Sequence, residues 1–380
     1  MRCKNTIFSF RYPNKYMLIH LITIDYRLWT IDLICYFCTM SMSLQQRIEV
    51  LAELGRRLGE PNKKLDEIIQ KTYLHHKWST TENTQLALQA IRQEFLDKNK
   101  LQTWAAQYNV ADHPTPKKVC IILSGNIPFE GFRDVLNVFV AGHQSIIKLS
   151  EKDEHLIPYL FTLMQEINPD STNYFEVVER IKDADNVIVT NVDEATRYYE
   201  TYFEKYPNII RKRLTSVAVL TGNESEQDWK NLGIDVFRFF GLSNRNVSKL
   251  YLPKGYDLAP LLEFWKRFEH LIHHNKFKNN FDYNYSLILM NGLPHISNGI
   301  ILMQEAEDIS ARTAMLYYEY YENLNEVAQK LQTHQNEIQC IVANQSIKNL
   351  NITPFGQPHY PTLNDYPNRI DTMDFLTTQL

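Results

Sequence analysis

Glycine and cysteine are both scarce in this sequence, with 12 and 5 examples among 380 residues. No G-x-G-x-x-G segment occurs, so the dinucleotide-binding fingerprint of the Rossmann fold is absent. The five cysteines are too few and too dispersed for a disulfide framework, which favours a reducing, cytoplasmic location. Cys35 and Cys38 form a C-x-x-C pair, but without a second ligand pair or a thioredoxin-like context we expect no metal or redox role.

An excess of positive charge is also missing. The chain has 40 basic and 44 acidic residues, so it lacks the basic surface by which nucleic-acid-binding proteins are recognised, and we expect no nucleic-acid partner. With 44% hydrophobic and 22% charged residues, the composition is that of an ordinary globular protein, long enough for two domains.

Residues 1–41 differ from the remainder, because they are rich in Tyr, Ile, Phe and Leu. Asp25, Arg27 and Asp32 interrupt the apolar run, so neither a secretory signal nor a membrane span is indicated. Helical periodicity begins immediately after Met42. We interpret residues 1–41 as a non-native leader or disordered extension, with a weak membrane-surface anchor as the alternative.

The remaining chain alternates between helical and strand-like segments. Residues 42–98 predict three amphipathic helices, after which the apolar run 119–123, a helix over 130–140 and a strand over 145–148 form a βαβ unit. Further strands are predicted at 186–190, 216–220 and 249–252, with helices at 194–206 and 226–239, and a third region with mixed elements from 287 to 342. Because continuous apolar strands are typical of parallel sheets, the pattern predicts an α/β fold.

Polar residues follow two of these predicted strands. Ser124, Gly125 and Asn126 lie between a strand and a helix, where backbone N–H groups bind anions and an amide can donate to a carbonyl oxygen. Lys148 ends the next strand, with Ser150 beside it, and could hold a phosphate or a ribose hydroxyl. The alternative interpretations are that residues 124–126 only form a turn and that Lys148 is a solvent-exposed residue at the edge of the sheet. Two adjacent histidine pairs lack the i, i+4 spacing of a metal clamp.

Taken together, several segments resemble the acyl-CoA reductase family, which includes the fatty-acid reductase of bacterial luminescence systems and lies within the aldehyde dehydrogenase-like superfamily. The resemblance covers residues 42–376. It implies a helical N-terminal region (42–113), a Rossmann-type cofactor domain (114–222), an α/β catalytic domain (223–350) and a C-terminal segment (351–380) that returns to the domain interface. The segments that carry it are GNIP, AGH, IIKLSEKD, IIRKRLTSVAVLTGNE, GLSNRNVSKLYLP, NFDYNYSLIL, PFGQP and DTMDFL.

The resemblance also implies a reaction: a cysteine attacks a fatty acyl-CoA or acyl-protein thioester, and hydride from NADPH releases the aldehyde. Asn126 would stabilise the oxyanion. The cofactor would be held by Ser124, Gly125, Lys148, Ser150, Thr190 and Asn191. Related folds often self-associate, so a homo- or hetero-oligomer is a further expectation.

The nucleophile is absent from this sequence. Where the family typically reads G-L-G-C-R-N-V-S, this chain reads GLSNRNVS and places Asn244 at the cysteine position. An amide neither ionises near neutral pH nor forms a labile acyl intermediate. A glycine-serine pair is replaced by Asn191-Val192, and a usual proline is missing near residues 310–312. Three functions therefore remain open: a reductase, a non-catalytic protein that binds acyl groups or nucleotides, and a structural partner of an active paralogue.

Overall fold

The computed structural model describes residues 42–181, 183–192 and 196–378, all of which belong to a single unit by their contacts. The predictions for residues 1–41, including the leader and the Cys35–Cys38 pair, lie outside this range. Among the described residues, no helix is long and apolar enough to cross a membrane.

Between residue 42 and β1 there are four helices, and each begins at a residue whose side chain accepts a hydrogen bond from the backbone. The caps Ser43, Asn62, Thr80 and Asp97 start α1 (Leu44–Arg57), α2 (Lys63–His75), α3 (Thr81–Glu94) and α4 (Lys98–Ala105). The three helices predicted over 42–98 are confirmed, and α4 was not predicted.

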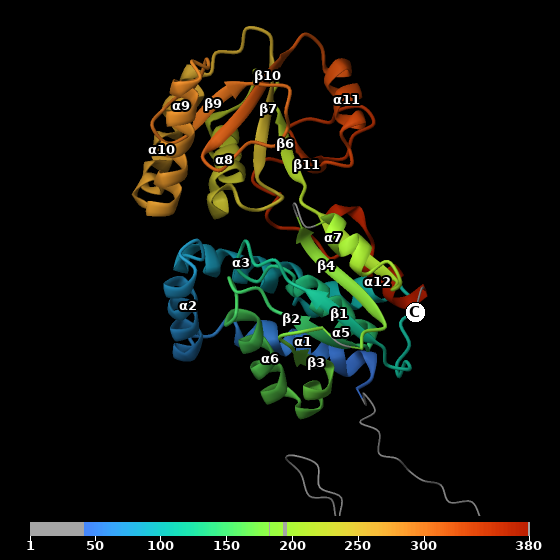
Figure 1. Cartoon of the computed structure of the whole chain (residues 1–380). Coiled ribbons are helices and arrows are strands. Elements are labelled where there is room, and N and C mark those ends of the chain that lie inside the picture. Colours follow the sequence, from blue (N-terminus) through green and yellow to red (C-terminus); the bar gives the residue numbers. More distant parts are fainter. Residues whose placement is uncertain (1–41, 182, 193–195, 379–380) are drawn as a thin grey trace, which may run out of the picture. The chain divides into compact units, whose positions relative to one another are not determined.

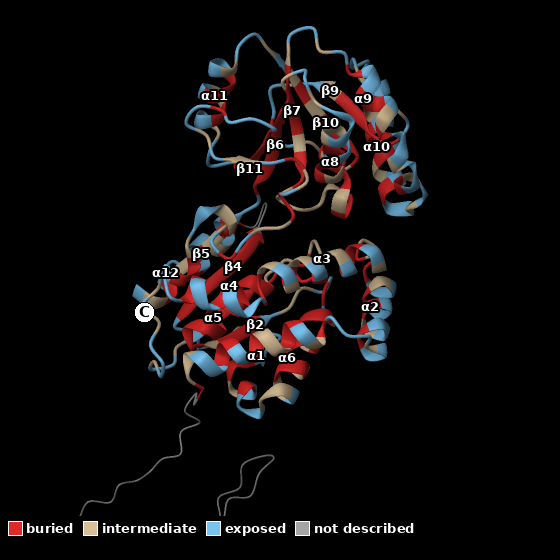
Figure 2. Cartoon of the chain, turned by 180° about the vertical axis from the view of Figure 1, so that it is seen from behind, coloured by how far each residue is buried: buried red, intermediate tan, exposed pale blue. Residues whose placement is uncertain are grey.

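The first sheet has five parallel strands in the order β3-β2-β1-β4-β5. This order matches the first five strands of the doubly wound Rossmann order 3-2-1-4-5-6. Its elements are β1 (Lys118–Ile122), α5 (Phe132–Ala141), β2 (Gln144–Lys148), α6 (Leu156–Ile167), η1 (Pro169–Tyr174), β3 (Phe175–Val177), β4 (Asn186–Val192), α7 (Thr196–Tyr202) and β5 (Asn208–Lys212). The short strands β3 and β5 were not predicted. All ten residues of α5 are buried, as Figure 2 shows.

The second sheet has seven strands in the order β12-β11-β6-β7-β10-β9-β8, parallel except for the β8–β9 pair. Figure 1 shows α8, α9 and α10 on one face and α11 on the other. The elements are β6 (Thr215–Val219), α8 (Glu226–Phe237), η2 (Arg238–Gly241), β7 (Val247–Pro253), α9 (Ala259–Phe264), η3 (Trp265–His273), α10 (Asn275–Met290), β8 (Ile296–Ser297), β9 (Leu302–Glu305), β10 (Met315–Tyr321), α11 (Leu324–Thr333), β11 (Ile338–Val342) and β12 (Ile352–Thr353).

The end of the chain returns to the first sheet. After η4 (Pro367–Arg369), helix α12 (Thr372–Thr378) packs against α5. The sequence-based boundary at residue 222 falls after β6, which pairs in the second sheet. The loops after β1 and β4, the loop before β7 and the C-terminal segment all contribute to one cavity, described next.

Candidate functional site

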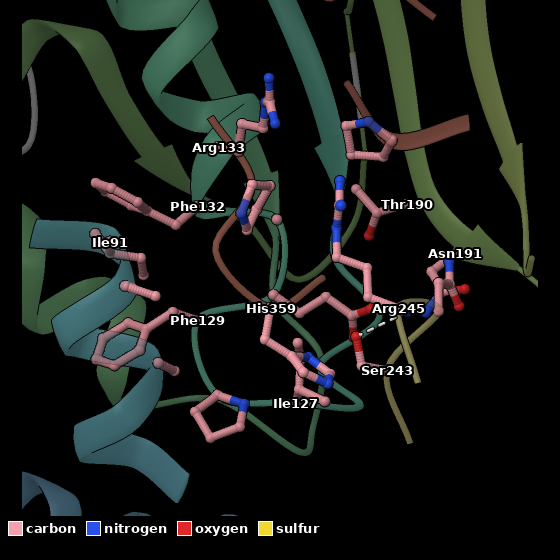
Figure 3. Close-up of a pocket in the computed structure, with 18 of the residues that line it drawn as sticks. Ile91, Ile127, Phe129, Phe132, Arg133, Thr190, Asn191, Ser243, Arg245 and His359 are labelled. Carbon is pink, nitrogen blue, oxygen red and sulfur yellow. Dashed lines mark hydrogen bonds between the residues drawn. The ribbon is translucent and has the colours of Figure 1, made fainter. Parts of the chain in front are cut away.

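A cavity of about 190 Å³ lies where α3, the loop before α5, the end of β4 and the loop before β7 meet. Figure 3 shows its lining. One part of the wall is apolar and comes from α3 and the 127–132 segment. The other part is polar. The lining includes Ala87, Ala90, Ile91, Phe95, Ile127, Phe129, Glu130, Phe132, Arg133, Asp134, Thr190, Asn191, Arg211, Phe239, Ser243, Asn244, Arg245, Gln339 and His359.

An unusual backbone turn presents the loop before β7 to this cavity. Phe239, Phe240 and Gly241 are three consecutive residues with positive φ, at 53°, 57° and 76°. The left-handed conformation costs about 1–2 kcal/mol for a residue other than glycine, so the turn must be stabilised by packing. Phe239 packs edge-on against the ring of His359, and Phe240 stacks on His274 with ring centres 4.4 Å apart. The two phenylalanines thereby anchor the loop on both sides.

Asn246 organises the loop itself. Its Oδ1 accepts the backbone N–H of Ser243 at 2.9 Å, and its Nδ2 donates to the carbonyls of Asp235 and Arg238 at 2.9 and 2.8 Å. The carbonyl of Asn244 accepts a hydrogen bond from the Ser216 hydroxyl at 2.9 Å. These bonds hold Asn244 at the cavity wall.

Two arginines tie the C-terminal segment to the cavity. Arg245 donates to Asp365 Oδ2 at 2.8 Å and lies 3.4 Å from the sulfur of Cys340. Burial opposes the charged form of Arg245, but Cys340 and Asp365 together raise its pKa above the ordinary value. Arg133 donates to the carbonyls of Asp365 and Leu363, and burial, reinforced by the nearby Arg245, lowers the pKa of Arg133 to about 10.

A fully buried charge pair also lies at the same cavity. Arg211 Nη1 and Asp134 Oδ2 are 2.7 Å apart, and both side chains are at most 3% exposed. Arg211 also donates to the hydroxyl of Thr372 at 2.6 Å, which joins β5 to α12. The pair therefore connects the first sheet with the returning C-terminal helix.

Several buried polar atoms of the lining have no hydrogen-bond partner in the described part of the chain. Native proteins leave few such atoms unsatisfied, so water or a ligand is expected to complete these bonds. The cavity is thus built for a molecule with both an apolar part and hydrogen-bonding groups. The atoms are Arg133 Nε, Asp134 Oδ1, Asn191 Oδ1, Arg211 Nε, Asn244 Oδ1 and Asn368 Oδ1.

The residues predicted to bind the cofactor or stabilise the oxyanion divide into two groups. Thr190 and Asn191, like Asn244, line the cavity, whereas Ser124, Gly125, Asn126, Lys148 and Ser150 do not. The side-chain oxygen of Asn126 accepts a bond from Lys152 at 2.7 Å. Its backbone N–H donates to Glu130, whose other carboxylate oxygen accepts a bond from Asn191 at 2.6 Å. Glu130 therefore links the Asn126 loop to the cavity.

The second group gathers at the carboxyl edge of the first sheet. A Cβ added at Gly125 would lie 2.8 Å from that of Ser150, so the loops after β1 and β2 touch. The Ser124 N–H donates to the Thr190 hydroxyl at 3.1 Å. Lys148 is exposed at the end of β2, and no described residue forms a hydrogen bond or ion pair with its ammonium group. This edge therefore offers an amine and hydroxyls at the strand ends, where nucleotides bind in such sheets.

The adenosine side of a nicotinamide dinucleotide fits these residues better than the nicotinamide side does. Lys148 has an ammonium group that no described residue binds, and the Ser150 hydroxyl, which accepts the Lys152 N–H at 3.3 Å, can still donate a hydrogen bond to a ribose or phosphate. At Asn191 the backbone is left-handed, with φ 49°, and the side chain is held by Glu130 at the cavity. The chain's own amide thus occupies space where the family resemblance implies a small residue.

No thiol faces the cavity among the described residues. Cys120 and Cys340 are both buried, and neither belongs to the lining. Burial raises the pKa of Cys120 to about 12 and also raises that of Cys340. Both therefore stay protonated near neutral pH and are poor nucleophiles. Over the same described range, no cluster of three or more His, Cys, Asp or Glu side chains could hold a metal ion.

The sequence analysis did not single out Glu130, Arg133, Arg245 or His359 as site residues. Two signals were available. Arg245 directly follows Asn244, and His359 directly follows the PFGQP segment. Neither signal indicates that residues more than a hundred positions apart line one cavity.

Comparison with known proteins identifies the class of fold. No protein-family model and no curated protein sequence matches this chain. Aldehyde dehydrogenase C from Pseudomonas syringae, solved as a mutant with NAD+ and octanal, is 14% identical, with a TM-score of 0.59 and coverage of 81% of this chain and 73% of its own. Lactaldehyde dehydrogenase from Escherichia coli is 13% identical, with a TM-score of 0.59 and coverage of 82% and 76%.

A third similar structure, the NAD+ complex of aldehyde dehydrogenase from Bacillus cereus, is 10% identical with a TM-score of 0.59, and covers 81% of this chain and 73% of its own. At such identities the likeness concerns the fold. The chain has an aldehyde dehydrogenase-like α/β fold with helices at the start of the described range, which confirms the predicted fold class.

Proposed function

We propose that this protein binds an acyl thioester, a fatty acyl-CoA or acyl-protein, in the cavity beside Asn244, and that it does not form the acyl-cysteine intermediate of the reductases it resembles. The proposal rests mainly on the position of Asn244. Its amide lies at the cavity wall with a buried, unpartnered oxygen, and no described cysteine lines that cavity.

The shape and chemistry of the cavity support an acyl ligand. A cavity of roughly 150 Å³ with apolar walls is large enough for benzene, so about 190 Å³ accepts an apolar group of at least six carbons. The apolar wall from α3 would contact the chain, while the amides of Asn191 and Asn244 face the polar end. The Pseudomonas syringae aldehyde dehydrogenase was itself solved with octanal.

A nicotinamide dinucleotide is the second ligand that we propose, and the resemblance favours NADP. Lys148 and Ser150 would hold its ribose or phosphate groups, with Gly125 supplying a backbone N–H group beside the Ser124 hydroxyl. When bound, such a cofactor supplies hydride. The Asn191 side chain narrows the space beside Glu130, so we expect weak binding of the nicotinamide end.

Full NADPH-dependent reduction of the thioester to an aldehyde is the second candidate. The Lys148 ammonium at the strand edge, which no described residue binds, favours this function, because it could hold the cofactor. It requires another nucleophile, since a carboxamide cannot form a labile acyl intermediate.

One set of measurements separates these functions. Three proteins are compared: the unaltered protein, Asn244→Cys and the matched control Asn244→Ala. In each, octanoyl-CoA binding is measured by calorimetry, and aldehyde formation and NADPH oxidation are measured alongside. We expect saturable octanoyl-CoA binding in all three proteins and aldehyde only in Asn244→Cys, with an acyl thioester mapped to position 244. Absence of binding would refute the proposal. Aldehyde formation by the unaltered protein would establish the reductase instead.

A further inference from the structure

We propose that the same cavity binds the ionised carboxylate of a free medium-chain fatty acid, with Arg133 as the residue that receives its charge. This ligand differs from the acyl thioester proposed above, because a thioester carries no charge at its carbonyl end. A fatty acid would use the same apolar wall, but its binding requires no recognition of the thioester or its carrier.

Arg133 is a buried charge of the lining without an opposite charge beside it. Arg211 is paired with Asp134 at 2.7 Å. Arg245 is paired with Asp365 at 2.8 Å. Arg133, in contrast, forms no ion pair with any described residue, and its guanidinium donates only to two backbone carbonyls. The residue is 6% exposed, and charges buried to this extent are normally paired.

The other carboxylate of the lining, Glu130, is bound elsewhere. Its two oxygens accept hydrogen bonds from Asn191 Nδ2 at 2.6 Å and from the Asn126 N–H at 2.5 Å. Figure 3 shows Asn191 on a different side of the cavity from Arg133. Glu130 therefore serves the Asn191 side and leaves the charge of Arg133 for a ligand.

Arg133 also has a donor that can bind this ligand. Its Nε is buried without a hydrogen-bond partner in the described structure, and so is the Nε of Arg211, which lines the same cavity. Burial and the nearby charge of Arg245 lower the pKa of Arg133 to about 10, so the guanidinium stays protonated at neutral pH. A carboxylate has about four lone-pair positions that accept such N–H groups. An anion here would complete missing bonds and offset the repulsion between the arginines.

The apolar wall selects the kind of carboxylate. Ile91, Phe129 and Phe132 are buried and lie along one side of the cavity, as Figure 3 shows. The guanidinium of Arg133 lies 5.3 Å from the centre of the Phe95 ring, which also lines the cavity, so the charge borders the apolar surface. Each methylene group buried there should raise the affinity about fourfold. A fatty acid is therefore favoured over acetate or an inorganic anion.

Octanoate and 1-octanol test the inference, because they have the same number of carbons and differ in charge. By calorimetry we expect saturable octanoate binding, at least about tenfold tighter than that of 1-octanol, since the alcohol lacks charge-assisted hydrogen bonds. Arg133→Gln removes the charge and should weaken octanoate binding by about 10–100-fold while leaving 1-octanol binding within about twofold. Arg56→Gln, on the exposed surface of α1, is the matched control and should change neither affinity.

Two results would overturn the inference. One is equal affinity of the unaltered protein for octanoate and 1-octanol, a comparison that does not depend on whether Arg133→Gln folds. The other is octanoate binding that persists unchanged in an Arg133→Gln protein shown to be folded by its 1-octanol binding. Acetate or inorganic phosphate that binds as tightly as octanoate would likewise refute a fatty-acid site.

The outcomes are distinguishable from those of the proposed function. Octanoate binding without octanoyl-CoA binding would support the fatty-acid site and refute the thioester site. Octanoyl-CoA binding without octanoate binding would do the reverse. If both bind, octanoate should displace octanoyl-CoA, because the two ligands use the same apolar wall, and simultaneous binding of both would contradict the fatty-acid site in this cavity.

Discussion

Replacing the buried Asp235 with asparagine is expected to reduce the loss of stability that accompanies a rise in pH from about 4 to 8. Asp235 lies in α8 and is 0% exposed. One carboxyl oxygen accepts the Gly356 N–H at 2.7 Å, and the other has no partner within the described structure. Its backbone carbonyl accepts a bond from Asn246, so this group supports the loop that carries Asn244.

The expected loss of stability can be calculated from the pKa of Asp235. Burial raises the pKa of Asp235 to about 8, although the hydrogen bond from Gly356 and the charge of Arg238 oppose the rise. In the unfolded chain the carboxyl ionises near pH 4, so between pH 4 and 8 the folded state holds one proton more than the unfolded state. Stability is therefore greatest below about pH 4 and falls as the pH rises through 8. At about 1.36 kcal/mol per tenfold change in proton affinity, the loss approaches 5 kcal/mol as an upper limit.

Urea unfolding at pH 5, 7 and 9, followed by tryptophan fluorescence, measures this loss. Asp235→Asn can accept the same hydrogen bond from Gly356 and cannot ionise. Its free energy of unfolding should decline less between pH 5 and 9 than that of the unaltered protein, by several kcal/mol. Asp66→Asn, on the exposed surface of α2, is the matched control and should behave like the unaltered protein. Equal declines in Asp235→Asn and the unaltered protein would show that Asp235 is ionised in the folded state, which contradicts the reasoning.

Three further predictions concern stability. Arg211→Met should lower the free energy of unfolding in urea by about 3–5 kcal/mol, because Asp134 stays buried without its partner. Adding Asp134→Leu to this variant should restore most of the lost stability. If the losses from the two mutations simply add, Arg211 and Asp134 are not a coupled pair. Gly125→Ala should lower Tm more than Gly255→Ala does. Both glycines have positive φ, but only at Gly125 would the new Cβ lie against another loop, at Ser150. Equal shifts in Tm would disprove that contact. Phe240→Ala should cost about 3–5 kcal/mol, because it removes a buried ring that contacts His274 and Phe277 and leaves a cavity, and an unchanged unfolding midpoint would refute its anchoring role.

The sequence predicted those parts of the fold that local patterns encode. The apolar run 119–123 identified β1 as a buried parallel strand, and the polar cluster around Thr80 located the start of α3. The strands β3 and β5 were not predicted from the sequence. β3 has only three residues and an exposed pair, and β5 alternates in burial and ends in charged residues, so neither forms a long apolar run.

The candidate site was predictable only in part. The position of Asn244 could be located from the loop pattern, but its neighbours could not, because Asn191, Arg133 and His359 approach it from other elements. Asn126 illustrates the difference. Its place after a strand predicts a ligand-facing amide, whereas the folded chain gives that oxygen to Lys152, 26 residues further on.

By itself, the sequence determined the α/β alternation, the helix starts and the missing thiol, because each depends on residues within a few positions of one another. Only the tertiary structure decided which polar groups share the cavity and which of them lack partners. Those properties depend on contacts between distant segments, such as Glu130 with Asn191 and Arg245 with Asp365, and on the burial that the whole fold imposes. Burial also sets the protonation of Asp235 and His359, which no local pattern reveals.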